Sequence, residues 1–163
     1  MEENKKPILV LGIGNLLFKD GGVGIHVVQK MMDMDLPPSV EVIDGGKRST
    51  GAIYISEKKR KAIVITALKA GGTPGTIYRF PEQAFEEKRK GFERSIEEIE
   101  ITDDLSKAHM LGKNPDEVIF IGVEPEDIGE KNMKHDSTLT PLIEGKLPEI
   151  IEAVMREIRN KSM

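Results

Sequence analysis

The sequence predicts an α/β protein in which a mainly parallel sheet lies between two layers of helices. Short apolar runs rich in branched side chains alternate with longer segments whose apolar residues recur at helical spacing. Continuous apolar runs of this kind are typical of strands that helices cover on both faces. Because a length of 163 residues suits one ordinary domain, we expect residues 1–163 to form a single domain of this class.

The first unit of the chain is a strand, a glycine-rich turn and a helix. The run PILVL at residues 7–11 predicts a buried strand, which Gly12-Ile13-Gly14-Asn15 ends. From Gly22 to Met34 the apolar residues recur at helical spacing, and Pro37-Pro38 stops this helix.

Three further strands are expected in the middle of the chain. Residues 40–43 predict a short strand that ends at Asp44-Gly45-Gly46, and the apolar run at residues 62–66 predicts the next. The sequence at residues 71–75 is a glycine-rich turn, and residues 76–80 then alternate as a strand does.

The stretch of residues 82–100 is dense in charge of both signs. We expect a loop there, followed by a helix whose apolar stripe is Leu105, Ala108 and Leu111 and which ends at Gly112.

The last third of the chain predicts one more strand and a terminal helix. Residues 118–123 carry the strongest strand signal, and residues 124–136 form a polar connection. Thr140 is placed to cap the final helix, with Pro141 at its first position. Pro148 predicts a kink in this helix or a late start.

Composition excludes several classes of function. With 24 basic and 28 acidic residues the formal net charge is -4, which argues against a general nucleic-acid or anionic-membrane binder. The absence of cysteine excludes disulfides, thiolate metal sites and a cysteine nucleophile. No apolar run approaches the roughly 20 residues of a membrane span, and the N-terminal residues lack the apolar core of a signal peptide. We therefore expect a cytoplasmic protein.

Ligands of such sheets bind beyond the carboxyl ends of the strands. There, Gly12 and Gly14 are spaced as in a dinucleotide-binding loop, and Asp44 follows the second strand as a ribose-binding acid would. Leu17 occupies the place of the third glycine, however, so nucleotide binding is only a minor alternative. Neither a Walker phosphate loop nor a G-x-S-x-G elbow occurs in the sequence.

Histidines and clustered acids are the remaining candidates for metal binding. His26, His109 and His135 share no metal-ligand spacing, which favours surface or helix-edge positions. Five acids could gather a hard cation, although a solvated segment is the simpler interpretation. They are Glu97, Glu98, Glu100, Asp103 and Asp104.

Four blocks of sequence, in this order and spacing, resemble the hydrogenase maturation proteases over nearly the whole chain. They are ILVLGIGNLLFKDGGVGIHVVQKM at residues 8–31, IDGG at 43–46, TALKAGGTPGTIY at 66–78 and VIFIGVEPEDI at 118–128. The resemblance implies a three-layer α/β/α sandwich with a central, mainly parallel five-stranded sheet. It also implies cleavage of the C-terminal extension from the large-subunit precursor of a nickel-iron hydrogenase, with nickel used for recognition.

The family's metal-binding positions are substituted in this sequence. Where the family has an acid directly after Asp20, this chain has Gly21, and where the family strand ends in aspartate, it has Thr66. Glu97 stands where the family has a histidine. Because these positions share one metal in the family, we expect them to lie close together. Glu97 is at most one remaining ligand, so we expect no tightly bound cofactor and nickel only through the substrate.

The loops that match the family are retained and are possible substrate-binding loops, although turn glycines and acids also shape loops without any chemistry. Their residues are Asn15, Asp20, Asp44, Gly45, Gly46, Gly71 and Gly72. Two hypotheses remain open. The chain is either a divergent peptidase that cleaves its hydrogenase precursor, or a non-catalytic, chaperone-like relative that binds a hydrogenase or another metalloprotein subunit. The catalytic residues are not identified by the sequence.

Overall fold

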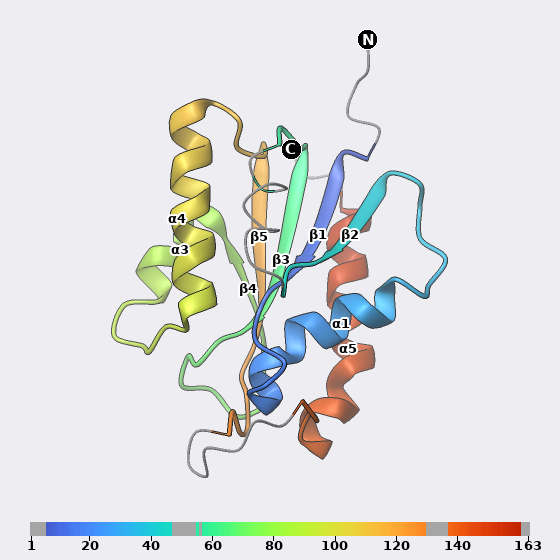
Figure 1. Ribbon diagram of the computed structural model, residues 1–163, viewed down its shortest axis with the longest axis vertical. Helices are drawn as coiled ribbons and strands as arrows, with labels where there is room; N and C mark the ends of the chain where they lie inside the picture. Colours follow the sequence, from blue (N-terminus) through green and yellow to red (C-terminus); the bar gives the residue numbers. More distant parts are fainter. Residues whose placement is uncertain (1–5, 47–54, 56, 130–136, 161–163) are drawn as a thin grey trace.

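A computed structural model of the chain describes residues 6–46, 55, 57–129 and 137–160. Within these described ranges lie five complete strands, four complete α-helices and one short 3-10 turn (Figure 1). The strands are β1 (Ile8–Gly12), β2 (Val40–Asp44), β3 (Lys61–Ala67), β4 (Ile77–Pro81) and β5 (Glu117–Val123). The helices are η1 (Lys19–Gly22), α1 (Val23–Met31), α3 (Glu82–Lys88), α4 (Ile96–Leu111) and α5 (Pro141–Arg159).

The five strands form one sheet in the order β2-β1-β3-β5-β4. β1 pairs in parallel with β2 and β3, and β3 pairs in parallel with β5, whereas β4 is antiparallel to β5 at the edge. The connection from β3 to β4 contains no helix, and a parallel crossover needs a longer connection, usually a helix. This confirms the expected α/β class with a mainly parallel five-stranded sheet.

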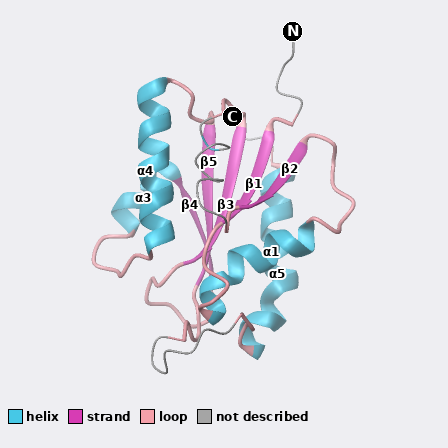
Figure 2. Cartoon of the chain, viewed as in Figure 1, coloured by secondary structure: helices cyan, strands magenta, loops and turns pink. Residues whose placement is uncertain are grey.

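Helices cover both faces of the sheet, so the strands are apolar on each side (Figure 2). On one face Val10 and Ile65 pack with Val27 of α1 and with Ile150 and Val154 of α5. This larger cluster explains the regular apolar stripes that made α1 and α5 recognisable in the sequence.

On the other face the sheet packs against α3 and α4. Leu11 and Val64 share a core there with Phe85 of α3 and with Ile101 and Leu105 of α4. The Phe85 ring stacks on Phe120 of β5 with the centroids 3.8 Å apart.

The expectation of a loop at the start of residues 82–100 is wrong. The structure has helix α3 over Glu82–Lys88, and α4 begins at Ile96, well before the stripe that predicted it. A single buried aromatic ring, Phe85, anchors α3 among exposed charged residues, and one anchor is too little to produce a periodic signal.

The terminal helix begins where the sequence predicts. The Thr140 hydroxyl accepts a hydrogen bond from the amide of Ile143, and α5 continues past Pro148 to Arg159. The alternative of a late start is therefore wrong, because a cap and an apolar face fix the helix on both sides of the proline.

Close approach between α1 and the sheet explains two glycines of the first block. A Cβ atom at Gly12 would lie 2.2 Å from the Gly24 carbonyl oxygen, and one at Gly24 would lie 2.2 Å from the Ile65 carbonyl oxygen. These glycines therefore serve helix-strand packing, which removes the need for a nucleotide to explain them. Within the described residues, no helix has the length and apolar character that a membrane span requires.

Candidate functional site

A cavity of about 230 Å³ opens at the carboxyl edge of the sheet. Its walls come from the segments after β1, β3 and β5 and from the turn that leads into α4. The lining residues are Asn15, Phe18, Gly21, Thr66, Ala67, Lys69, Glu93, Arg94, Ser95, Ile96, Glu97, Glu98, Pro125 and Ile128. Gly21, Thr66 and Glu97, which are far apart in the sequence, thus line one cavity, and their role in binding stays a prediction.

Gly21 lies in the short 3-10 turn between β1 and α1. Its carbonyl oxygen accepts from the Asn15 amide at 3.2 Å, and its own amide donates to the Phe18 carbonyl oxygen at 2.8 Å. A Cβ atom here would lie 3.2 Å from the Phe18 Cβ and 3.9 Å from a methyl carbon of Ile128. A side chain at position 21 would therefore extend among groups that line the cavity.

Thr66 is the next-to-last residue of β3 and is almost completely buried. Its hydroxyl donates to the Ala67 carbonyl oxygen at 3.3 Å. A single neutral hydroxyl already engaged with the backbone is a weak ligand for a divalent cation.

Glu97 is the second residue of α4, whose start Ser95 caps by accepting from the Glu98 amide at 3.0 Å. An acid in the first turn is favourable beside the positive end of the helix dipole. Glu97 lines the cavity and is partly exposed. Among the described residues, no hydrogen bond or ion pair engages it.

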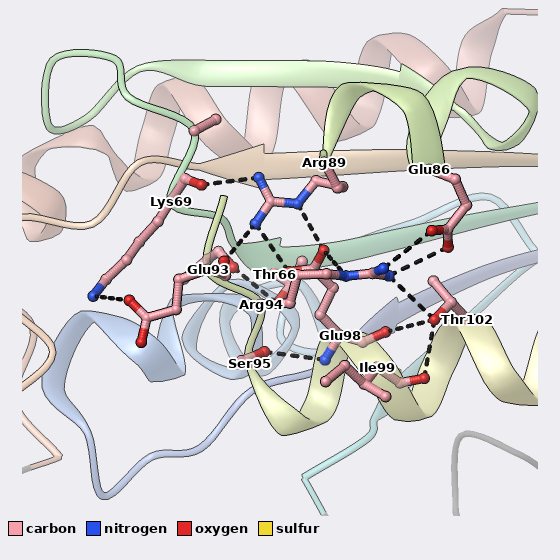
Figure 3. A network of polar contacts seen from close by, with 12 residues as sticks. Thr66, Lys69, Glu86, Arg89, Glu93, Arg94, Ser95, Glu98, Ile99 and Thr102 are labelled. Carbon is pink, nitrogen blue, oxygen red and sulfur yellow. Dashed lines mark hydrogen bonds and ion pairs between the residues drawn. The ribbon is translucent and has the colours of Figure 1, made fainter. Parts of the chain in front are cut away.

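A buried ion-pair network surrounds Glu98, the residue that follows Glu97 in α4 (Figure 3). The Glu98 carboxylate accepts from Arg89 at 2.6 and 3.1 Å and from Arg94 at 3.0 Å. Arg89 is 2 % exposed, and it also donates to the carbonyl oxygens of Lys69 and Glu93, each at 2.9 Å. One guanidinium thus fastens the segment after β3, the turn before α4 and α4 itself.

Arg94 continues this network toward solvent. It donates to both carboxylate oxygens of Glu86, at 3.0 and 3.3 Å, and to the Thr102 hydroxyl at 3.3 Å. Burial opposes its charge, but the hydrogen bond to Glu86 and the charges of Glu98 and Glu86 outweigh burial and raise the pKa of Arg94. Arg94 therefore stays charged, and its charge is balanced by two carboxylates.

The sequence analysis missed this network because Arg89, Arg94 and Glu98 lie in the stretch interpreted as a loop. The pattern Ser95-x-x-Glu98 is a helix-start signature that could have placed the helix correctly. Nothing in the sequence pairs Glu98 with Arg89, because a turn and a helix end separate them. The interpretation of residues 97–104 as a solvated acidic segment holds only in part, since Glu98 is buried.

Asp20, a candidate substrate-binding residue, is fully buried, and its carboxylate is hydrogen-bonded within the protein. Its carboxylate accepts from the amides of Glu126, Asp127 and Thr140 at 2.9, 3.1 and 2.9 Å. The Thr140 hydroxyl donates to it as well, at 2.9 Å. Asp20 joins the turn after β1, the segment after β5 and the cap of α5, which is a structural role.

Glu124 holds the glycine loop beside the cavity. One of its oxygens accepts from the amides of Ala70 and Gly72, at 2.9 and 3.2 Å, and from the Tyr78 hydroxyl at 2.6 Å. Burial and this contact with Glu124 raise the pKa of Tyr78 to about 12, so its hydroxyl remains a donor. Gly71 and Gly72 are therefore held in place next to Lys69, although they are not among the lining residues.

The other candidate loops divide between the cavity and its surroundings. Asn15 lines the cavity, and its side-chain oxygen accepts from the Leu17 amide at 2.9 Å. Asp44 accepts from the Gly46 amide at 2.9 Å and from Gln29, and Gly45 donates to the Gly12 carbonyl oxygen at 2.8 Å. The turn after β2 thus shapes its own edge of the sheet and lies outside the cavity.

The residues at the family's metal positions do not fit a resident nickel or zinc ion. Such a site needs three or four nitrogen or carboxylate ligands, and positions 21, 66 and 97 offer one carboxylate. Within the part of the chain that the structure describes, no group of three histidine or acidic side chains could hold a metal. His26 lies 2.9 Å from the Ser137 carbonyl oxygen and His109 lies 2.8 Å from Glu82, and His135 falls outside the described residues.

Fold and cavity together define a three-layer α/β/α protein with a cavity at the carboxyl edge of its sheet. The family model described as hydrogenase maturation protease matches residues 25–157 of this chain. Because the match covers most of the chain, the chain belongs to the hydrogenase maturation protease family.

Individual relatives agree with this assignment. A putative hydrogenase maturation protease of Methanocaldococcus jannaschii is 32% identical over 159 residues, covering 95% of this chain and 98% of that protein. The coenzyme F420 hydrogenase subunit delta of Methanothermobacter thermautotrophicus is 30% identical over 157 residues, covering 93% and 94%. The hydrogenase maturating endopeptidase HybD from E. coli has a similar structure, with a TM-score of 0.81 and 26% identity over 93% of this chain and 91% of HybD. The chain is thus similar to hydrogenase maturation endopeptidases.

Proposed function

We propose that this chain acts on the large-subunit precursor of a nickel-iron hydrogenase and hydrolyses one peptide bond to release its C-terminal extension. The observation that carries the proposal is the cavity, because Gly21, Thr66 and Glu97 line it together in a chain that belongs to this family. Nickel belongs to the substrate in this proposal. Hydrolysis adds one water molecule across the peptide bond, giving the mature carboxyl terminus and a free peptide.

The proposal assigns the described residues to recognition and support. Arg89 and Glu98 fix the entry to α4, and Asp20 and Glu124 fix the loops after β1 and β3. A site made of fixed loops presents its walls to a peptide at little cost in ordering the protein. The buried position of these four residues suits supporting roles.

A second candidate is binding of the precursor without cleavage, as a chaperone-like module. It is favoured by the lack of a group of three metal-ligating side chains among the described residues. The name of one relative, a hydrogenase subunit delta, also fits a protein that stays with a hydrogenase.

One experiment separates the two candidates. The chain is incubated with the nickel-loaded precursor of the hydrogenase encoded by the same organism, and mass spectrometry follows the precursor's C-terminal extension. Loss of the extension supports the peptidase. A stable complex on size-exclusion chromatography with an unchanged precursor mass supports the binding module, and the absence of both cleavage and a complex would refute both candidates.

A matched pair of variants ties the outcome to the cavity. Gly21→Leu places a side chain among the groups that line the cavity, and it should abolish cleavage or binding. Gly145→Leu makes the same change at an exposed helix position where a Cβ atom meets no atom within 4 Å, and it should leave the activity unchanged. Circular dichroism checks that both variants fold. Activity retained in folded Gly21→Leu would place the site elsewhere.

A further inference from the structure

Among the described residues, the side chains that line the cavity carry an unbalanced negative charge. They include two cations, Lys69 and Arg94, and three carboxylates, Glu93, Glu97 and Glu98. Lys69 is paired with Glu93 at 3.2 Å, and Arg94 is paired with Glu98 at 3.0 Å. Among the charged groups that line the cavity, Glu97 is left as the excess carboxylate.

Including the groups behind the lining does not change this balance. Arg89 adds one positive charge and Glu86 adds one negative charge, and both belong to the same network around Glu98 and Arg94. The network is therefore saturated internally. An incoming anion would have to compete with the carboxylates that already hold these guanidinium groups, whereas an incoming cation finds a carboxylate ready to accept it.

The walls next to Glu97 are apolar. Phe18 and Ile96 line the cavity while remaining 37% and 69% exposed, and Pro125 and Ile128 line it from the segment after β5. Exposed apolar side chains around a cavity are typical of a surface that another molecule covers. A ligand that suits both features has an apolar stem and a cationic head, as the side chains of arginine and lysine have. The Phe18 ring adds an aromatic group that can attract a guanidinium.

We propose that this cavity binds an arginine or lysine side chain of the partner polypeptide, with Glu97 accepting the cationic head and Phe18, Ile96 and Ile128 covering the stem. The proposal rests on the proposed function only in taking the ligand to be part of a polypeptide. At the position where the family has a histidine, this chain has a carboxylate that recognises a side chain of the substrate. Glu97 is thus a specificity-determining residue of the cavity.

The test uses small probes and the full chain, so it needs no hydrogenase. N-acetyl-L-arginine amide and its neutral isostere N-acetyl-L-citrulline amide are titrated into ¹⁵N-labelled protein, and amide chemical shifts report binding. The arginine probe should shift the amides of residues that line the cavity, such as Gly21, Ala67 and Glu97. The citrulline probe should bind at least about tenfold more weakly, since it lacks the charge.

Variants assign the effect to Glu97. Glu97→Gln should weaken the arginine probe by about tenfold or more and leave the citrulline probe unchanged. Glu100→Gln removes the same charge from the same helix at an exposed residue outside the lining, and it should bind the arginine probe as the parent chain does. Raising the salt concentration should weaken only the charged probe.

Several results would overturn the proposal. They are equal affinity for the arginine and citrulline probes, equal weakening by Glu97→Gln and Glu100→Gln, shifts outside the cavity, and tighter binding of N-acetyl-L-glutamate amide than of the arginine probe. The glutamate result would point to Lys69 and Arg94 as the recognition groups. Because these readouts are independent of precursor cleavage, a negative cleavage assay with a positive titration would reject the peptidase and keep the pocket for a cationic side chain.

Discussion

At the scale of single residues, the carboxylates of this chain differ in the number of hydrogen-bond donors that they already accept from. Asp20 and Glu98 are buried and saturated with donors, whereas Glu97, one residue from Glu98, has no partner among the described residues. The sequence alone indicated Asp20 and Glu97 as candidate site residues but could not show which of the two carboxylates is available to a ligand. Whether a carboxylate is already hydrogen-bonded depends on donors from distant segments, such as the Thr140 amide that donates to Asp20.

Replacement of Asp20 tests its structural role. Asp20→Asn keeps the shape but turns one oxygen into an NH₂ group that faces backbone donors. We expect a loss of about 3 kcal/mol in the free energy of unfolding, because at least one buried amide loses its acceptor and a charge-assisted hydrogen bond is lost. Urea denaturation followed by circular dichroism measures this.

The matched control is Asp33→Asn, an exposed aspartate after α1 that should change the stability by less than about 0.5 kcal/mol. An Asp20→Asn variant as stable as the parent chain would show that the carboxylate is dispensable for joining these segments.

At the scale of elements, the strands and helices could be predicted where buried apolar residues recur at regular spacing. The strands β1, β3 and β5 are continuous apolar runs, and α1 and α5 have apolar stripes that the core uses. α3 and α4 are less regular, since they bury a few anchors such as Phe85 and Leu105 and expose Ile96 and Ile99. Hydrophobic periodicity in a sequence indicates a face that is regularly buried. Helices that are held by a few buried residues and by ion pairs lack this periodicity and are therefore harder to predict.

Helix α5 contains a glycine that packing does not require. Gly145 is exposed, and a Cβ atom there would meet no atom within 4 Å. Gly145→Ala should raise the free energy of unfolding by about 0.5–1 kcal/mol, because alanine loses less backbone entropy than glycine in a helix. Thermal and urea unfolding measure the gain.

The contrasting variant is Gly24→Ala in α1, whose Cβ atom would lie 2.2 Å from the Ile65 carbonyl oxygen. It should destabilise the chain, since helix and strand would have to separate. A gain in stability from Gly24→Ala would contradict the close packing of α1 on the sheet.

The end of α5 is fastened to the sheet by charge. Glu157 accepts from Arg79 of β4, and its carboxylate lies 3.1 Å from the buried ammonium of Lys61 in β3. Burial opposes the charge of Glu157, but the hydrogen bonds from Arg79 and Lys61 outweigh burial and lower its pKa below the ordinary 4.5. A lowered pKa stabilises the folded state above the ordinary value, and this contribution is lost as the pH falls through the folded-state pKa.

Glu157→Gln tests this fastening. At neutral pH it should reduce the free energy of unfolding by about 3 kcal/mol, since it leaves Lys61 buried with a weakened partner set. The difference from the parent chain should shrink as the pH drops below 4.5, where the unfolded chain takes up the proton first, and it should vanish below the folded-state pKa, where the carboxyl group is protonated in both states. Urea denaturation over a series of pH values measures the difference. Glu152→Gln, on the exposed side of α5, is the control, and a pH-independent difference for Glu157→Gln would contradict the assignment.

At the scale of the whole molecule, the site is assembled from segments that only the fold brings together. Parallel strands place the segments after β1, β3 and β5 at one edge, so the rule for open α/β sheets predicted where a cavity would lie. It could not predict that Gly45 and Gly46, the described residues directly after β2, stay outside the cavity, nor that the first turn of α4 lines it. The position of α4 depends on the ion pair of Arg89 with Glu98, which has no sequence signature.

Nickel binding is the property that this assembly should lack. Positions 21, 66 and 97 line one cavity but supply a single carboxylate, whereas a nickel or zinc site needs three or four nitrogen or carboxylate ligands. Calorimetric titration of the isolated chain with nickel at neutral pH should show weak binding or none. Gly21→Glu and Thr66→Asp together with Glu97→His should create a site that binds nickel at least about 100-fold more tightly than the parent chain does. A Cβ atom at position 21 would lie 3.2 Å from the Phe18 Cβ, so Phe18 has to shift slightly to admit it. Submicromolar binding by the parent chain that Glu97→Ala abolishes would show instead that Glu97 completes a metal site with ligands from elsewhere.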